Sequence, residues 1–113
     1  MKKTVIITGG NKGIGLDISK VFAKDGYTVF VGARENTKEL KELDGDIVFV
    51  KTNVKFEKDH QNLVKIALDK TDRLDTYINN AGFSAWRSIS NIDEKFLSNV
   101  LDTNLKGVFW GCK

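Results

Sequence analysis

The feature that most limits how this chain can fold is a glycine-rich turn between a β-branched run and an amphipathic stretch. Thr4–Thr8 has the composition of a buried strand, and Ile14–Asp25 carries apolar residues at helical spacing. Between them, Gly9 would permit a tight turn, Gly13 would let the backbone approach a pyrophosphate, and Gly15 would allow close helix packing. A helix N-terminus here would supply amides and a partial positive charge. The segment predicts a phosphate-binding loop, and a purely structural turn is the alternative.

The rest of the chain alternates strand-like and helix-like segments. Further strands are expected at Tyr27–Gly32, Ile47–Val50 and Leu74–Ile78, and further helices at Thr37–Leu43, Phe56–Thr71, Asp93–Leu101 and around Leu105, Val108 and Phe109. The inward helix faces are expected from Ile14, Ile18, Val21 and Phe22, and from Leu63, Val64, Ala67 and Leu68. This alternation predicts an α/β fold, a Rossmann-type doubly wound parallel sheet in the order 3-2-1-4 with helices on both faces.

Residues 1–113 are expected to form a single, partial domain. A sheet that ends at its fourth strand leaves an edge unpaired, which an isolated domain would rarely tolerate. The sequence therefore predicts a fold truncated before the C-terminal half of a longer domain. Without that half, a stable isolated unit would be unusual.

Charged side chains are spread along the chain without a block of either sign. The 18 basic and 15 acidic residues leave a net charge of +3, which gives no footprint for nucleic acid or a membrane surface. No segment approaches the roughly 20 apolar residues of a membrane span. Cys112 has no second cysteine to pair with, so the cytoplasm is the expected compartment. His60, the sole histidine, is expected to be exposed, and with Cys112 it cannot assemble a metal site.

Three segments together carry a family resemblance. Thr8–Gly15 reads Thr-Gly-x-x-x-Gly-x-Gly, Asn79–Gly82 reads Asn-Asn-Ala-Gly, and Asn104 lies within Asp102–Gly107. In this order they resemble the motifs of the short-chain dehydrogenase/reductase family, and they cover nearly the whole chain. The resemblance implies an oxidoreductase that transfers hydride between a nicotinamide cofactor and a small carbonyl or alcohol substrate. It also implies a homo-oligomer.

The resemblance implies a set of cofactor-binding residues. Those expected along the diphosphate and the adenosine ribose are Gly9, Asn11, Lys12, Gly13 and Ile14, with Gly15 allowing the helix to pack closely. Those expected under the two riboses are Asn80, Ala81 and Gly82, with Thr8 bracing that loop. Asn53-Val54 stands where the family has an Asp followed by an apolar residue against the adenine. Asn can still donate and accept at a base edge, although a simple turn at the end of the strand is the alternative.

The end of the second strand predicts which cofactor is used. NAD-binding sheets usually place a carboxylate there for the ribose 2′-hydroxyl, whereas this chain has Ala33 followed by Arg34. Arg34 and Lys12 would both attract a 2′-phosphate, and each charge-assisted bond contributes about 1.5 to 3 kcal/mol. NADP(H) is therefore expected and NAD(H) is less favoured. In the alternative, Arg34 is solvated and Glu35 takes the acidic residue's place.

The catalytic set of the family is largely missing from this chain. Neither Tyr27 nor Tyr77 begins a Tyr-x-x-x-Lys pair, and no catalytic Ser is recognised. Only Asn104 is carried over, as the helix residue whose backbone carbonyl would hold a water in the proton relay. The chain alone is expected to bind cofactor and to be nearly inactive. Two alternatives are a non-catalytic NADP(H)-binding half-domain or sensor, and a nucleoside-binding methyltransferase, which Ala33-Arg34 disfavours.

Overall fold

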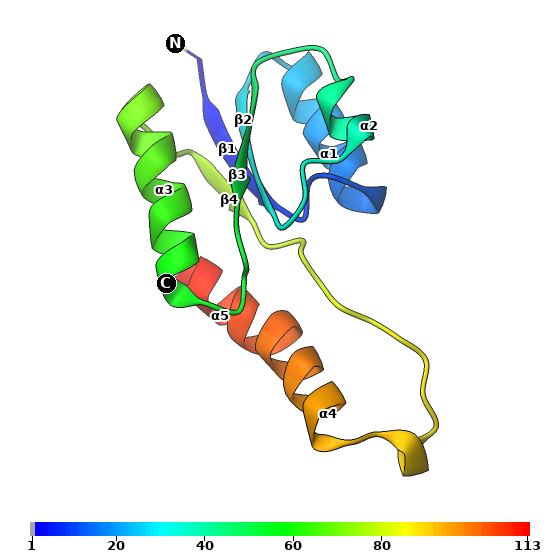
Figure 1. The fold of residues 1–113 in the computed structure, drawn as a ribbon. Helices are drawn as coiled ribbons and strands as arrows, with labels where there is room; N and C mark the ends of the chain where they lie inside the picture. The colour runs from blue at the N-terminus through cyan, green and yellow to red at the C-terminus, as the bar shows by residue number, and fades with distance from the viewer. Residues whose placement is uncertain (1) are drawn as a thin grey trace.

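The computed structural model describes residues 2–113 and contains one parallel four-stranded sheet. Its strands are β1 (Thr4–Thr8), β2 (Thr28–Ala33), β3 (Ile47–Lys51) and β4 (Thr76–Ile78). They lie in the order β3-β2-β1-β4, and all three pairings are parallel. The predicted fold class and strand order are confirmed (Figure 1).

Helices cover both faces of this sheet, as the alternating pattern predicts. They are α1 (Gly13–Lys24), α2 (Lys38–Lys41), α3 (Glu57–Thr71), α4 (Glu94–Leu101) and α5 (Gly107–Cys112). Figure 1 shows α1 and α2 on one side of the sheet and α3 on the other, with α5 beside the start of α3 and α4 extending away from the sheet. A 3-10 turn, Ile89–Asn91, precedes α4, and a π-helical turn, Asp102–Lys106, joins α4 to α5.

The two central strands are buried along their whole length. Parallel strands with helices on both faces read as continuous apolar runs, which is why β1 and β2 have no polar alternation. Val5 and Ile7 face the α1 side of the sheet, and Ile6 and Phe30 face the α3 side. All four are fully buried, and each contributes about 1.5 to 3 kcal/mol by leaving water. The core therefore consists of two layers, one on each side of the sheet.

The inward face of α1 agrees in part with the predicted one, because Ile18 and Phe22 pack against the core as expected. Ile14 and Val21, expected in the core, are 75% and 62% exposed. The helix instead turns two small buried residues, Gly15 and Ser19, toward the sheet, and the Ser19 hydroxyl donates to Gly10 O at 2.8 Å. These small residues let the helix approach β1 closely, and the larger apolar side chains pack at the margins of the contact. On α3, Leu68 was likewise expected in the core and is 40% exposed.

The prediction that His60 is exposed is also wrong. The ring is 3% exposed and lies on the inner side of α3. Burial is possible because both ring nitrogens have partners, the Tyr77 hydroxyl at 2.5 Å from Nδ1 and Val54 O at 2.9 Å from Nε2. Tyr77 itself lies in β4, as the sequence predicts, whereas Tyr27 immediately precedes β2.

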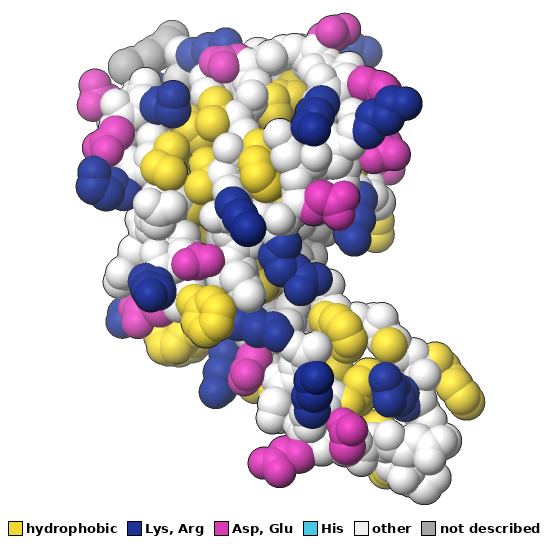
Figure 2. Space-filling model, viewed as in Figure 1, with side chains coloured by type: hydrophobic (Ala, Val, Ile, Leu, Met, Phe, Trp, Pro, Cys, Tyr) yellow, Lys and Arg dark blue, Asp and Glu magenta, His cyan; other side chains and the backbone are white. Residues whose placement is uncertain are grey.

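Large apolar side chains reach the surface on the C-terminal part of the chain. Figure 2 shows them over α4 and the loop that precedes it, at the lower right of the view. The most exposed are Trp86, Ile89, Leu105 and Phe109. No helix within residues 2–113 combines the length and the apolar character needed to cross a membrane.

Candidate functional site

A cleft of about 590 Å³ opens at the carboxyl ends of the strands. Open parallel sheets bind ligands at this edge, where the strand order reverses, which here is between β1 and β4. The predicted cofactor residues that line it are Gly9, Asn11, Lys12, Ile14, Gly15, Arg34, Asn53, Val54, Asn80, Ala81 and Gly82. Thr8, Gly13 and Asn104 are not among its lining residues.

The floor of the cleft is the turn from β1 into α1. Gly9 has a positive φ of 68°, which L side chains rarely adopt, and its amide donates to Gly32 O at 2.8 Å. Gly15 has no room for a side chain, because a Cβ there would lie less than 3.0 Å from both Gly9 O and Asn80 Nδ2. These contacts bring the backbone of the turn, the first turn of α1 and the loop after β4 together around one space.

The N-terminus of α1 opens into the cleft, and no side chain within residues 2–113 caps it. Lys12 is the N-cap residue and makes no side-chain capping bond, and the first turn contains no acidic residue. The amides and the helix dipole therefore favour an anion at this point. A dinucleotide diphosphate fits this arrangement, because the glycine turn leaves room for it and Lys12 adds a positive charge.

Thr8 holds the two loops that border the cleft in register. Its hydroxyl oxygen accepts from the amides of Asn80 and Ala81, each at 3.1 Å. The Asn80 side chain returns a bond by donating from Nδ2 to Gly9 O at 3.1 Å. The loop after β4 is therefore fixed to the glycine turn on β1 through three hydrogen bonds.

Asn11 also braces the site through its side chain. It is 4% exposed, and its Nδ2 donates to Glu35 O at 2.8 Å. The Thr37 hydroxyl donates to Asn11 O at 2.5 Å. Both bonds tie the segment after β2 to the glycine turn, so the Asn11 side chain sets the position of that segment beside the cleft.

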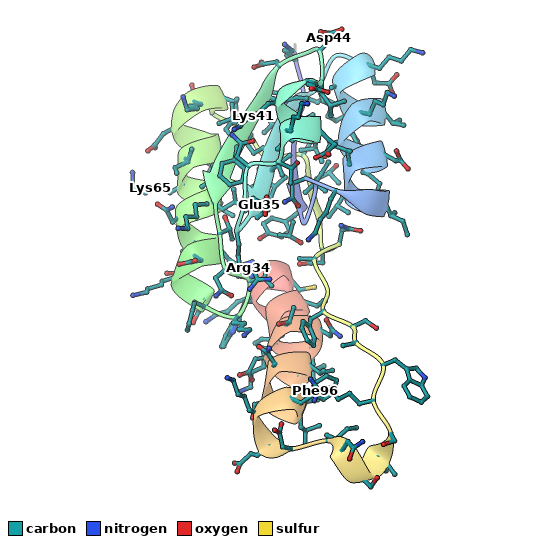
Figure 3. The ribbon with its side chains drawn as sticks, turned by 45° about the vertical axis from the view of Figure 1, so that its right-hand side comes forward. Arg34, Glu35, Lys41, Asp44, Lys65 and Phe96 are labelled. Atoms are coloured by element: carbon teal, nitrogen blue, oxygen red, sulfur yellow. The ribbon has the colours of Figure 1, made fainter. Side chains whose placement is uncertain are left out.

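Arg34 and Glu35 lie at the carboxyl end of β2, and both line the cleft. Figure 3 shows Arg34 at the end of the sheet nearest α5, with Glu35 beside it. Within residues 2–113, the Arg34 guanidinium has no hydrogen-bonded or ion-paired partner in the protein. A positively charged fork is therefore available to an anionic ligand at the end of β2.

The residues that follow β3 form a wall of the cleft next to the end of β2. Asn53 Oδ1 accepts from the Lys55 amide at 3.1 Å, and the Asn53 amide donates to the Asp59 carboxylate at 2.7 Å. Val54 is 9% exposed and packs against Gly107 of α5. The Asn53 side-chain amide nitrogen has no hydrogen-bond partner within residues 2–113 and can bind a ligand, and Val54 presents an apolar surface.

The cleft also contains residues that the sequence did not single out, namely Thr52, Lys55, Asn99 and Thr103. Lys55 Nζ donates to Asn99 Oδ1, which joins the β3 wall to α4. Asn99 and Thr103 lie four residues apart near the junction of α4 with the π-helical turn. The sequence signal that could have identified Lys55 as a cleft residue is its position directly after the Asn53-Val54 pair.

Asn104 lies in the π-helical turn between α4 and α5, and its side chain holds the loop after β4. Oδ1 accepts from the Phe83 amide and Nδ2 donates to the Phe83 carbonyl, both at 2.7 Å. Single π-helical turns within longer helices are frequent at functional sites. The Asn104 side chain is thus occupied by the loop, so a catalytic contribution of this residue would come from its backbone.

Comparison with known proteins agrees with this geometry. The family described as short chain dehydrogenase matches residues 3–113. The chain is 34% identical to a diacetyl reductase [(S)-acetoin forming] of Staphylococcus epidermidis, over 98% of this chain and 46% of that protein. It is 32% identical to the 3-oxoacyl-[acyl-carrier-protein] reductase FabG of Chlamydia pneumoniae, over 97% of this chain and 47% of that protein.

Solved structures give the same result. A variant of actinorhodin polyketide ketoreductase with NADPH superposes with a TM-score of 0.88 at 28% identity, over 98% of this chain and 45% of that chain. A short chain dehydrogenase from Bacillus anthracis gives a TM-score of 0.88, also at 28% identity. The chain spans about half the length of the curated relatives it matches. By sequence and by fold, it belongs to the short-chain dehydrogenase family.

Proposed function

We propose that this chain forms the NADP(H)-binding half of an oxidoreductase that transfers hydride between the nicotinamide and a small carbonyl or alcohol substrate. The observation that carries the proposal is the pairing, in one cleft, of an uncapped α1 N-terminus with two cations, Lys12 and Arg34, that have no ion-paired partner among residues 2–113. That combination suits a diphosphate and a 2′-phosphate on the same ligand. The similar ketoreductase structure with NADPH supports the same cofactor class.

In this proposal each part of the cleft has a separate task. The amides at the start of α1 bind the diphosphate, and Lys12 and Arg34 bind the 2′-phosphate. Val54 lies against the adenine with Asn53 at its edge, and the loop Asn80–Gly82 supports the riboses. The bound cofactor supplies the hydride, while this chain binds and orients it.

The proton-transfer part of the reaction is assigned outside these residues. The chain has no Tyr-x-x-x-Lys pair, and the one family catalytic residue it shares is Asn104, whose backbone we propose would hold a water. The names of the similar reductases support a carbonyl compound as substrate. A cytoplasmic location and a homo-oligomeric whole protein complete the proposal.

Calorimetric titration of the chain with NADPH and with NADH tests the cofactor assignment. We expect NADPH to bind at least about tenfold more tightly, since one charge-assisted bond contributes about 1.5 to 3 kcal/mol. Arg34→Asp should reverse this preference. Lys41→Asp makes the same change in charge on α2, outside the cleft, and should leave the preference unchanged.

Two results would contradict the proposal. Arg34→Asp protein that binds NADPH as tightly as the wild type would remove Arg34 from the 2′-phosphate site. A folded wild-type chain that binds neither nucleotide would overturn cofactor binding as a whole. Circular dichroism of each variant establishes that it is folded before binding is compared.

A further inference from the structure

A hydrogen-bonded pair of polar side chains, His60 and Tyr77, lies at the margin of an apolar layer of this protein. On the α3 side of the sheet, the buried cluster consists of Ile6, Phe30, Val50, Leu63 and Ala67. His60 and Tyr77 lie beside it, with ring centroids 6.0 Å apart and planes inclined by 27°. Burying a polar group costs free energy unless it is hydrogen-bonded. The groups bonded to the buried His60 ring are therefore the ones whose positions this pair can fix.

The direction of the two hydrogen bonds follows from their chemistry. Val54 O can only accept, so His60 Nε2, at 2.9 Å, is the donor. In this tautomer Nδ1 accepts, and the Tyr77 hydroxyl at 2.5 Å donates to it. Burial raises the pKa of the Tyr77 hydroxyl, which keeps its proton in place. A directed chain therefore runs from Tyr77 on β4, through His60 on α3, to the backbone of Val54.

Val54 is where this chain of bonds reaches the cleft. Its carbonyl accepts from His60, and its side chain packs so closely on α5 that a Cβ at Gly107 would lie 3.1 Å from Val54 Cγ2. The preceding amide, that of Asn53, is held by the Asp59 carboxylate. The wall at the end of β3 thus depends on α3 and α5 for its position, with His60 as the only side chain bonded to Val54 itself within residues 2–113.

We propose that His60 and Tyr77 are positioning residues, which hold the Val54 wall and thereby set the affinity of the cleft for the adenine end of a nucleotide. This inference rests on the proposed function, because it assumes that an adenine lies against Val54. Neither side chain lines the nucleotide cleft, so the effect is transmitted through the Val54 backbone.

Removal of the Tyr77 hydroxyl isolates this effect. His60 and Tyr77 also line a second cleft, of about 500 Å³, between α3 and α5. Tyr77→Phe therefore opens no closed void, and its consequences report the lost bond to His60. Tyr27→Phe deletes the same group from the other tyrosine, which packs against Phe22 in the opposite layer and is absent from both clefts.

The test compares two ligands and three proteins. The ligand 2′,5′-ADP carries the adenine, whereas inorganic pyrophosphate occupies only the start of α1. We expect Tyr77→Phe to raise the dissociation constant of 2′,5′-ADP by about three- to tenfold, the range for one lost hydrogen bond, and to leave that of pyrophosphate unchanged. Tyr27→Phe should match the wild type for both ligands. General loosening of the fold would weaken both ligands together and would overturn the inference.

A ligand-free measurement separates this inference from the proposed function. In ¹H–¹⁵N spectra, the amides of residues 53–55 should shift in Tyr77→Phe and stay in place in Tyr27→Phe. His60 is the only histidine, so its ring ¹⁵N signals report one site, and they should show the Nε2–H tautomer in the wild type. Unmoved amides, or an Nδ1–H tautomer, would overturn the positioning role. If the wild type binds no adenine nucleotide, the proposed function fails, and the amide shifts alone decide whether the pair positions Val54.

Discussion

Substitution of Gly15 by alanine tests whether the cleft depends on close contact between α1 and the glycine turn. An alanine near the start of a helix normally stabilises it, by up to about 1 kcal/mol relative to glycine. Here the added methyl group would lie less than 3.0 Å from Gly9 O and Asn80 Nδ2. Both atoms belong to the bond that fixes the loop after β4, so neither can move freely. The structure therefore predicts that steric overlap outweighs the gain in helix propensity.

The size of the effect follows from three contributions. Overpacking of a tight contact costs about 1 to 3 kcal/mol. Loss of the bond from Asn80 to Gly9 adds about 0.5 to 1.5 kcal/mol. After the helix-propensity gain is subtracted, we expect Gly15→Ala to lower the free energy of unfolding by about 0.5 to 3.5 kcal/mol.

Urea denaturation followed by circular dichroism measures this change. With a slope near 1 kcal/mol per M, typical of small proteins, the midpoint should fall by about 0.5 to 3.5 M. Gly82→Ala is the matched control within the same cleft, since its methyl group would lie 3.4 Å from Asn104 Oδ1 and 4.0 Å from Asn80 O, both ordinary contacts. A Gly15→Ala protein as stable as the wild type would refute the reasoning, because it would mean that α1 does not touch the turn.

Two further predictions concern the two ends of β1, which are hydrogen-bonded to the segments that flank β4. Thr8→Val should lower the free energy of unfolding by about 1 to 3 kcal/mol in urea denaturation, because two amides lose their acceptor. Thr4→Val should not lower it, since Thr4 Oγ1 is buried with no hydrogen-bond partner within residues 2–113. Equal losses of stability in the two variants would contradict this assignment. Bonding to the Arg73 guanidinium and to the Thr4 amide lowers the pKa of Asp75 from its ordinary 3.8. The Asp75 carboxylate therefore stabilises the fold above the unfolded pKa, and this contribution is lost as pH falls through the lowered folded value. Asp75→Asn should be less stable than the wild type at pH 7, and the two should converge only as pH falls below the lowered folded pKa of Asp75. A stability difference independent of pH would argue against this assignment.

The fold was predictable from the sequence because local and long-range signals agree. The β-branched runs of β1 and β2 are buried on both faces, so they read as strands without any competing periodicity. The glycines between Thr8 and Ile14 mark the loop at the switch point, and its contacts with Asn80 join two segments that the motif pattern had already associated.

The predictions that failed depend on tertiary contact. Helical spacing could not show that α1 packs through Gly15 and Ser19, because small buried residues do not contribute to an apolar pattern. His60 was expected at the surface because its neighbours are charged. Its partner, Tyr77, lies on another element, and no local pattern links the two.

The roles of the loop residues were partly hidden for the same reason. Asn11 and Asn104 were identified from motifs, but the direction of their side chains depends on backbone groups distant in sequence, at Glu35 and Phe83. Lys55 and Asn99 meet only when α4 lies across from β3. A sequence motif gives the place of such residues, and the folded backbone decides which group they bind.

The π-helical turn Asp102–Lys106 makes the site sensitive to the number of residues in the chain. A π-helical turn holds about one residue more than an α-helical turn, and each residue of an α-helix advances it by about 100°. Deleting one residue here would restore a regular helix from α4 to α5 with little change in their relative rotation, whereas an added residue that continues the helix would rotate α4 by about that angle relative to α5. After such an insertion, Asn99 would leave the cleft and lose Lys55, while the contact of Gly107 with Val54 would remain. Insertions between Leu101 and Gly107 should therefore alter the cleft more than substitutions there do.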